Sequence, residues 1–241
     1  MMKLAPQVNT ALELLEAAGY EAYLVGGAVR DFVRDSSPAK DWDIATNALP
    51  EQVKAVFAGF RLIETGLKHG TVTVVIDHIQ LEITTYRVDG QYHDSRHPDA
   101  VRFVPQVQPD LARRDFTINA MAYNEKEGLV DPFGGQADLQ SGIVRAVGVP
   151  RQRFTEDALR ILRLYRFAAR FGFSIDPPTA QAAQELCAHL DCVSVERIEE
   201  ELAKLLSAPA PAAYLDKKIL LVILPELSSE ALAAAKPVTK S

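Results

Sequence analysis

The segment VGGAVRDFVRDSSPAKDWDIAT, residues 25–46, contains a glycine turn, a helical pattern and two aspartates one residue apart. Its last part, DWDIAT, alternates as a strand does, so Asp41 and Asp43 point to one face while Trp42 packs on the other. Two carboxylates so close raise the pKa of one of them unless a cation keeps both ionised. Mg²⁺ suits such a pair because it binds carboxylate oxygens and keeps positions for water and phosphates. A solvated pair of acids at a strand end is the alternative.

The glycine turn lies upstream of these acids, between an apolar strand and a helix. Gly26 and Gly27 allow backbone N–H groups to approach an anion, and the N-terminus of the following helix favours negative charge. Arg30 can then reach a phosphate with its forked guanidinium. A metal-binding pair and a phosphate-binding turn in one segment indicate nucleotide chemistry.

Composition and charge narrow the class of protein. The chain has 241 residues and a net charge of -6, which argues against a surface covered with nucleic-acid-binding charge. Residues 151–170 nevertheless carry six arginines against Glu156 and Asp157, so we expect a local anionic ligand there. No apolar run approaches the ~20 residues that span a bilayer, and no secretory signal is present. We therefore expect a cytoplasmic protein without a membrane partner, in which Cys187 and Cys192 are reduced and half-buried.

Hydrophobic periodicity predicts a mixed sheet flanked by helices over residues 1–90. Two β-branched runs separated by Asp77 and His78 predict a hairpin. Residues 87–100 are polar and lack periodicity, which is typical of a long loop. Residues 101–104 are expected to return to the sheet, and residues 111–124 to form a helix. From Phe154 onward the pattern is helical throughout.

Two other enzyme classes fit these motifs poorly. Dehalogenase-like phosphatases place their D-x-D pair after a hydrophobic strand and a threonine two residues beyond it, whereas here SSPAK precedes the acids and Thr46 lies three residues beyond. His93 and Asp94 form an HD dipeptide, but no second histidine–aspartate set follows at helical spacing. A metal phosphohydrolase is therefore not expected.

Five motifs in order resemble those of one enzyme family: YLVGGAVRD, DWDIAT, LARRDFTINAMA, VDPFGG and RFTEDALRILRLYRFAAR. Together they resemble the class II tRNA nucleotidyltransferases, the bacterial-type CCA-adding enzymes and their poly(A) polymerase relatives. The resemblance runs from about Tyr23 to Leu206. It implies an α/β (α+β) polymerase-β-like nucleotidyltransferase head with a mixed sheet, followed by an all-helical neck domain. We expect the head at residues 1–149, the neck at 150–207, and the start of a body region at 208–241, with a boundary near Val149.

The resemblance also implies roles for residues of the head. Asp41 and Asp43 would be catalytic and bind Mg²⁺, and Glu82 is the candidate third carboxylate, with a cross-strand surface charge as its alternative. Asp115 and Asn119 are four apart, so on a helix they share one face; a capping and salt-bridge cluster is the other interpretation. The nucleotide-binding residues implied in the head are Gly26, Gly27, Arg30, Arg114, Asp115 and Asn119.

In the neck, the motif EDALR is the most informative. Asp157 and Arg160 are three apart and therefore neighbours on one helix face. A carboxylate accepts and a guanidinium donates, so the pair can mimic the edge of a base, which in this family is how CTP and ATP are chosen without a template. Arg163 and Arg166 would meet the phosphates. Without the upstream motifs, a salt-bridged exposed helix would be the simpler interpretation.

The expected function is Mg²⁺-dependent, template-independent addition of CMP and AMP from CTP and ATP to the 3′ end of tRNA. An A-adding enzyme or poly(A) polymerase is the alternative enzyme, and a catalytically weak nucleotide- or RNA-binding module is the alternative from another class. Residues 89–100 resemble the flexible loop that helps such enzymes switch from C to A addition. Full-length relatives continue into body and tail domains, so we expect a truncated form, a fragment, or a compact relative whose RNA-binding parts lie elsewhere.

Overall fold

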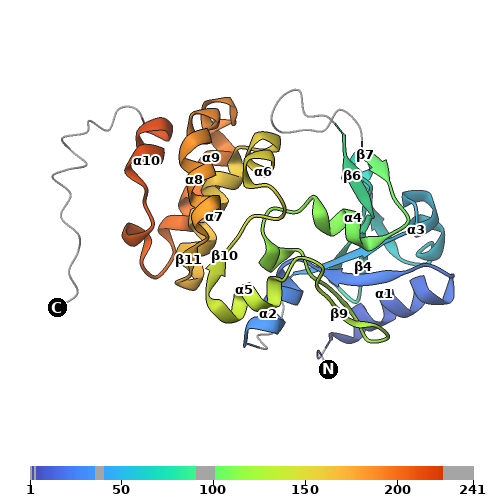
Figure 1. Ribbon diagram of the computed structural model, residues 1–241. Helices are drawn as coiled ribbons and strands as arrows, with labels where there is room; N and C mark the ends of the chain where they lie inside the picture. Colours follow the sequence, from blue (N-terminus) through green and yellow to red (C-terminus); the bar gives the residue numbers. More distant parts are fainter. Residues whose placement is uncertain (1, 3, 36–40, 91–100, 225–241) are drawn as a thin grey trace. The chain divides into compact units, whose positions relative to one another are not determined.

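The computed structural model describes residues 2, 4–35, 41–90 and 101–224, and these form two compact units (Figure 1). The first unit holds the described residues up to Gln140, and the second holds those from Ser141 onward. The second unit starts before the expected boundary near Val149 because β10 (Ile143–Val144) pairs in parallel with β11 (Ser174–Ile175). No described helix has the length and apolar character that a membrane crossing requires.

A seven-stranded mixed sheet organises the described part of the first unit, in the order β3-β4-β5-β2-β1-β8-β9. β2 pairs with β5 in parallel, and the other neighbours are antiparallel. This confirms the mixed sheet expected from the sequence. The strands are β1 (Ala22–Val25), β2 (Trp42–Thr46), β3 (Arg61–Ile63), β4 (Thr71–Ile76), β5 (Ile79–Thr85), β8 (Ala122–Asn124) and β9 (Gly128–Val130).

The hairpin of β4 and β5 follows directly from its sequence pattern. Alternate residues of β4 are buried, as expected for a strand with one face on the core. Asp77 and His78, which join the strands, both have positive φ, at 44° and 70°. Two such residues match the twist of the flanking strands, so the predicted hairpin is confirmed.

Helices cover the sheet and supply the rest of this core. α1 (Pro6–Ala17) and α3 (Pro50–Val56) contact each other, α1 also contacts β1, and α3 contacts β4 and β5 (Figure 1). α2 (Gly27–Asp35) begins immediately after β1 and packs on β1 and β2. Proline at the first position of α1 and α3 suits a helix start because its missing N–H has no partner there.

Part of the predicted loop is ordered as a second, two-stranded sheet. β6 (Arg87–Asp89) pairs with β7 (Val101–Phe103), so residues 87–89 are not loop and residues 101–103 do not return to the main sheet. Tyr86 links the two sheets, because its N–H donates to Thr46 and its carbonyl accepts from Val104. The remaining residues of that prediction, 91–100, including the HD dipeptide, lie outside the described residues.

The helix predicted over residues 111–124 is wrong. α4 (Val107–Ala112) is followed by the 3₁₀ turn η2 (Thr117–Asn119) and then by β8. The Asp115 carboxylate accepts a hydrogen bond from the Phe116 N–H at 2.8 Å, which competes with helical backbone bonding. α5 (Gly135–Ser141) comes after β9.

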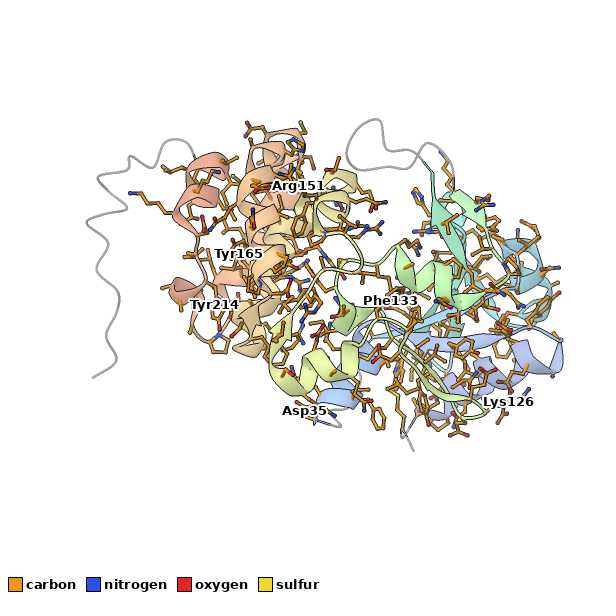
Figure 2. All side chains as sticks on the ribbon, viewed as in Figure 1. Asp35, Lys126, Phe133, Arg151, Tyr165 and Tyr214 are labelled. Atoms are coloured by element: carbon orange, nitrogen blue, oxygen red, sulfur yellow. The ribbon has the colours of Figure 1, made fainter. Side chains whose placement is uncertain are left out.

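The described residues of the second unit, 141–224, are helical apart from the pairing of β10 with β11 and the connecting segments. α7 packs on α9, and α6 packs on α8; Figure 2 labels Arg151 on α6 and Tyr165 on α7. α7 ends at a glycine, Gly172, with φ 69°. Cys187 is buried and Cys192 exposed, and neither forms a disulfide, so only the half-buried placement was wrong. The helices are α6 (Pro150–Glu156), α7 (Leu159–Phe171), α8 (Pro177–Leu186), η3 (Cys187–Cys192), α9 (Val195–Leu206), η4 (Pro211–Ala213) and α10 (Lys217–Ile223).

Candidate active site

The acid pair lies where the central strands of the first unit meet. Asp43 is the second residue of β2, opposite Val25 of β1 and in register with Glu82 of β5. Trp42 is buried, while Asp41 is exposed just before the strand. Because residues in register on neighbouring strands share a face, Asp43 and Glu82 point to the same side of the sheet. The register therefore brings a third carboxylate to the predicted pair and places all three near the glycine turn that follows Val25.

Negative charge accumulates around Asp43. Burial raises the pKa of its carboxyl, and the charges of Glu82 and Asp41 raise it further, while the Arg114 guanidinium opposes them. Among the described residues, no group of three or more His, Cys, Asp or Glu side chains has an arrangement that would hold a metal ion by itself. Mg²⁺ commonly needs only one or two carboxylates together with substrate phosphates, so this donor set fits it.

Gly26 lies next to both the Asp43 carboxylate and the Arg114 guanidinium. Its φ is 70°, and a Cβ atom at this position would lie 3.3 Å from Asp43 Oδ2 and 3.5 Å from Arg114 Nη1. Both the backbone conformation and the lack of room therefore favour glycine. Three residues from separate sequence motifs thus lie close together in the fold: Gly26, Asp43 and Arg114.

A buried hydrogen-bond network lies beneath the second glycine of the turn. Arg30 is 5% exposed; its Nη1 donates to Asn119 Oδ1 at 2.7 Å, and its Nε donates to Asp31 Oδ1 at 2.9 Å. Asn119 Nδ2 in turn donates to Asp115 Oδ1 at 3.0 Å. A Cβ on Gly27 would lie 3.5 Å from Arg30 Nη2. The predicted neighbours Asp115 and Asn119 do meet, but in a 3₁₀ turn rather than on a helix face.

Sequence patterns did not point to Asp110, which supports this site. It lies on α4 and is 1% exposed, and it forms ion pairs with Arg113 at 2.9 Å and with Arg114 at 3.3 Å. Burial alone would raise the pKa of its carboxyl, but the two guanidiniums outweigh that effect and lower it. The sequence did contain one signal of these ion pairs: Asp110 lies three residues before Arg113 and four before Arg114, a spacing that places side chains next to one another on a helix.

In the second unit, Asp157 does not share a helix face with Arg160 as predicted. It lies in the break between α6 and α7, with an extended backbone at φ −149° and ψ 104°. Its Oδ1 accepts from the Leu159 N–H at 3.1 Å, and its Oδ2 accepts from Arg197 Nη2 at 2.9 Å. A carboxylate bonded to the amide two residues ahead favours a helix start, which explains why the predicted continuous helix is interrupted.

Arg160 is held across that break by Glu156. Its Nη1 donates to Glu156 Oε2 at 2.7 Å and to the carbonyl of Arg153 at 3.0 Å. Arg153 Nη2 donates to the other Glu156 oxygen at 2.6 Å. Glu156 therefore fixes two guanidiniums at the N-terminal end of α7.

Arg163 and Arg166 gather around a buried acid of α9. Glu201 is 5% exposed and lies 2.6 Å from Arg166 Nε and 3.8 Å from Arg163 Nη1. The guanidinium of Arg166 also lies over the ring of Phe167, 4.1 Å from its centroid. The arginine-rich segment at residues 151–170 thus contributes in part to an ion cluster that joins α7 to α9, and Glu201 is a member of this cluster that the sequence did not reveal.

Comparisons with known proteins agree with this arrangement. Residues 22–145, more than half of the chain, match the family model described as the poly A polymerase head domain, and residues 172–230 match the model described as the probable RNA and SrmB-binding site of polymerase A. The chain belongs to the class II CCA-adding enzyme and poly(A) polymerase family. The polymerase-β-like head that the sequence predicted is confirmed by this membership.

Several members of this family are similar over most of the chain. The CCA-adding enzyme of Lactobacillus delbrueckii subsp. bulgaricus is 49% identical over 199 residues, which cover 83% of this chain and 50% of the relative. The CCA-adding enzyme of Geobacillus stearothermophilus is 46% identical over 204 residues, covering 85% and 50%. The chain thus spans about half the length of these curated relatives.

Solved structures show the same fold. The crystal structure of the Bacillus stearothermophilus CCA-adding enzyme in complex with CTP matches with a TM-score of 0.84 and 40% identity, over 95% of this chain and 56% of that one. The Thermotoga maritima CCA-adding enzyme complexed with tRNA_CCA matches with a TM-score of 0.74 and 26% identity, over 92% and 54%.

Proposed function

We propose that this chain catalyses Mg²⁺-dependent, template-independent addition of CMP and AMP from CTP and ATP to the 3′ end of tRNA, with release of pyrophosphate. The observation that carries the proposal is the position of Asp43, in register between Val25 and Glu82, beside Gly26 and Arg114. Carboxylates, a glycine turn and a cation at one point are what a triphosphate and its metal ion require.

Within this proposal, Asp41 and Asp43 hold the metal ion, and Glu82 is the third carboxylate. When bound, Mg²⁺ aligns the primer 3′-hydroxyl with the α-phosphate and stabilises the developing charge. Gly26 and Gly27 let the backbone approach the triphosphate at the N-terminus of α2. Arg114 provides the positive charge beside Asp43, since its Nη1 lies against the position of Gly26.

In this proposal, Arg30 supports the triphosphate side of the nucleotide, and Asn119 and Asp115 support its sugar side. Their network is buried and each side chain bonds to the next, so the groups are oriented before a ligand binds. Such preorganisation reduces the entropy that binding would otherwise cost. A network that contacts a 2′-hydroxyl would favour ribonucleotides over deoxyribonucleotides.

In the second unit, Asp157 and Arg160 are proposed to read the base. The Asp157 carboxylate is held by Arg197 and by the Leu159 N–H, and the Arg160 guanidinium is held by Glu156. An acceptor and a donor, each fixed by its own partner, suit recognition of cytosine or adenine edges without a template. Arg163 and Arg166 would serve the phosphates, and Arg163, whose side chain is 33% exposed, is the more accessible of the two.

The decisive experiment measures incorporation of labelled CTP and ATP, each alone and together, into tRNA lacking its 3′ CCA, with and without Mg²⁺. CTP-dependent addition followed by a terminal A supports the proposal. Addition from ATP alone would instead identify an A-adding enzyme or poly(A) polymerase. Binding of CTP without transfer to any primer would reduce the chain to a nucleotide-binding module.

A further inference from the structure

Asp110 joins three parts of the first unit through one buried carboxylate. Its Oδ1 accepts from the Arg87 N–H at 3.2 Å and from Arg113 Nε at 2.9 Å, and its Oδ2 accepts from Arg114 Nη2 at 3.3 Å. Arg87 is the first residue of β6, so the same carboxylate contacts the base of the two-stranded sheet and the site arginine.

The geometry of a guanidinium makes this contact important for the site. The group is planar and rigid, so a partner that fixes one terminal nitrogen also sets the direction of the other. Asp110 holds Nη2 of Arg114, and Nη1 of the same side chain is the nitrogen that lies against Gly26, where Asp43 Oδ2 also lies. Moving the carboxylate would therefore turn the end of Arg114 that faces the glycine turn.

We propose that Asp110 is a positioning residue for nucleotide binding: it sets the orientation of Arg114 toward the triphosphate space at Gly26. This inference rests on the proposed function, because it takes the group beside Gly26 to be a nucleotide phosphate. Asp110 touches no reacting group itself, and it acts through Arg114.

Asp110→Asn is the suitable change because it removes charge without removing volume. The amide oxygen can still accept from the Arg87 N–H, so β6 keeps its anchor. The amide N–H₂ is a donor, like the guanidinium, and leaves Arg114 without its charged acceptor. Arg113→Gln is the matched control, because it removes the other guanidinium from the same carboxylate and leaves the Arg114 contact intact.

The experiment is a double-mutant cycle on the full chain, read as the Kd for Mg²⁺·CTP and as kcat and KM for incorporation. Asp110→Asn is expected to weaken CTP binding about tenfold, as loss of one charge-assisted hydrogen bond implies. Arg114→Ala is expected to have a similar effect, and the double variant should bind no worse than Arg114→Ala alone. Arg113→Gln should lower stability and leave the Kd for CTP within about twofold of the wild type.

The proposal is overturned by additive losses in the double variant, and equally by a loss of CTP affinity in Arg113→Gln as large as that in Asp110→Asn. If Asp110→Asn does not fold, Asp110→Glu takes its place, since it keeps the ion pairs but carries its carboxylate farther out. It is expected to weaken CTP binding about threefold, and an unchanged Kd would contradict the inference. If the wild type binds CTP without transferring it, the proposed function fails, but the Kd values of the double-mutant cycle still test the role of Asp110. If the wild type does not bind CTP, the proposed function and this inference are both overturned.

Discussion

Arg30 of the first unit and Arg160 of the second are held in different ways. In the first unit, Arg30 bonds to Asn119, which lies 89 positions further along the chain, and this contact exists only because the sheet and the η2 turn come together. In the second unit, Arg160 pairs with Glu156 four residues away. Arg30 therefore takes its place only when distant parts of the chain come together, whereas the main partner of Arg160 is already nearby in the sequence.

The strongest test of this contrast is loss of the acid in the centre of the sheet. Asp43→Asn is expected to reduce nucleotide transfer by about 10³-fold or more, since it removes a proposed metal ligand while keeping the shape of the side chain. Incorporation of labelled CTP measures the effect, and circular dichroism verifies the fold. Asp77→Asn, an exposed change in the hairpin turn, is the control; transfer that survives Asp43→Asn would remove the metal assignment.

A second test places a methyl group between the acids and Arg114. Gly26→Ala is expected to reduce transfer about 10²-fold, because the new Cβ must displace Asp43 Oδ2 by a few tenths of an ångström and the backbone has positive φ. Gly128→Ala is the matched control, since its φ is 74° and nothing lies within 4 Å of the added Cβ. Equal losses in the two variants would mean that backbone strain alone is responsible.

A third test addresses the second unit. Arg160→Ala is expected to change the ratio of CTP to ATP incorporation about tenfold, because one of two fixed recognition groups is lost. Since Arg160 pairs locally, the thermal stability of the chain should change little. Arg151→Ala, on the exposed surface of α6, provides the comparison. An unchanged preference between the two nucleotides would contradict base reading by this arginine.

The smallest expected effect is on stability at low pH. The pKa of Asp110 is lowered in the folded chain from its ordinary value of 3.8, so its stabilising contribution is complete above that value. The contribution is lost as the pH falls through the lower folded value, at up to about 1.4 kcal/mol per pH unit for one group. Urea unfolding between pH 5 and pH 3 should show a shallower loss for Asp110→Asn than for the wild type; parallel curves would show that another group is responsible.

Sequence patterns predicted most of the sheet, since alternation marked β4 and β5. Motifs that are separate in the sequence also named Gly26, Asp43 and Arg114, which the structure brings together, while the roles of these residues stay a prediction. Patterns failed where side chains compete with the backbone. Beyond the end of α4, the Asp115 carboxylate takes the Phe116 N–H, which competes with helical bonding, and the residue types and spacing of this segment do not distinguish that outcome from a continuous helix.

The same competition explains the missed break at Asp157, whose carboxylate accepts from the Leu159 N–H. Buried partners were missed for a different reason. Asp110 and Glu201 look like ordinary charged residues of amphipathic helices, and only the packing around them shows that they are 1% and 5% exposed. Local spacing could suggest the arginine partners of Asp110, which lie three and four residues away, but the partners of Glu201 lie on another helix. The burial of both acids comes from elements that are distant in the sequence.

The parallel pairing of β2 with β5 also bears on the order in which the chain folds. The β4–β5 hairpin needs only the turn at Asp77 and His78, and such hairpins form in roughly 1–10 μs. Asp43 and Glu82 meet only when β2 docks on β5, which closes a much longer loop. Loop-closure entropy therefore favours formation of the hairpin before the carboxylates of Asp43 and Glu82 are brought together.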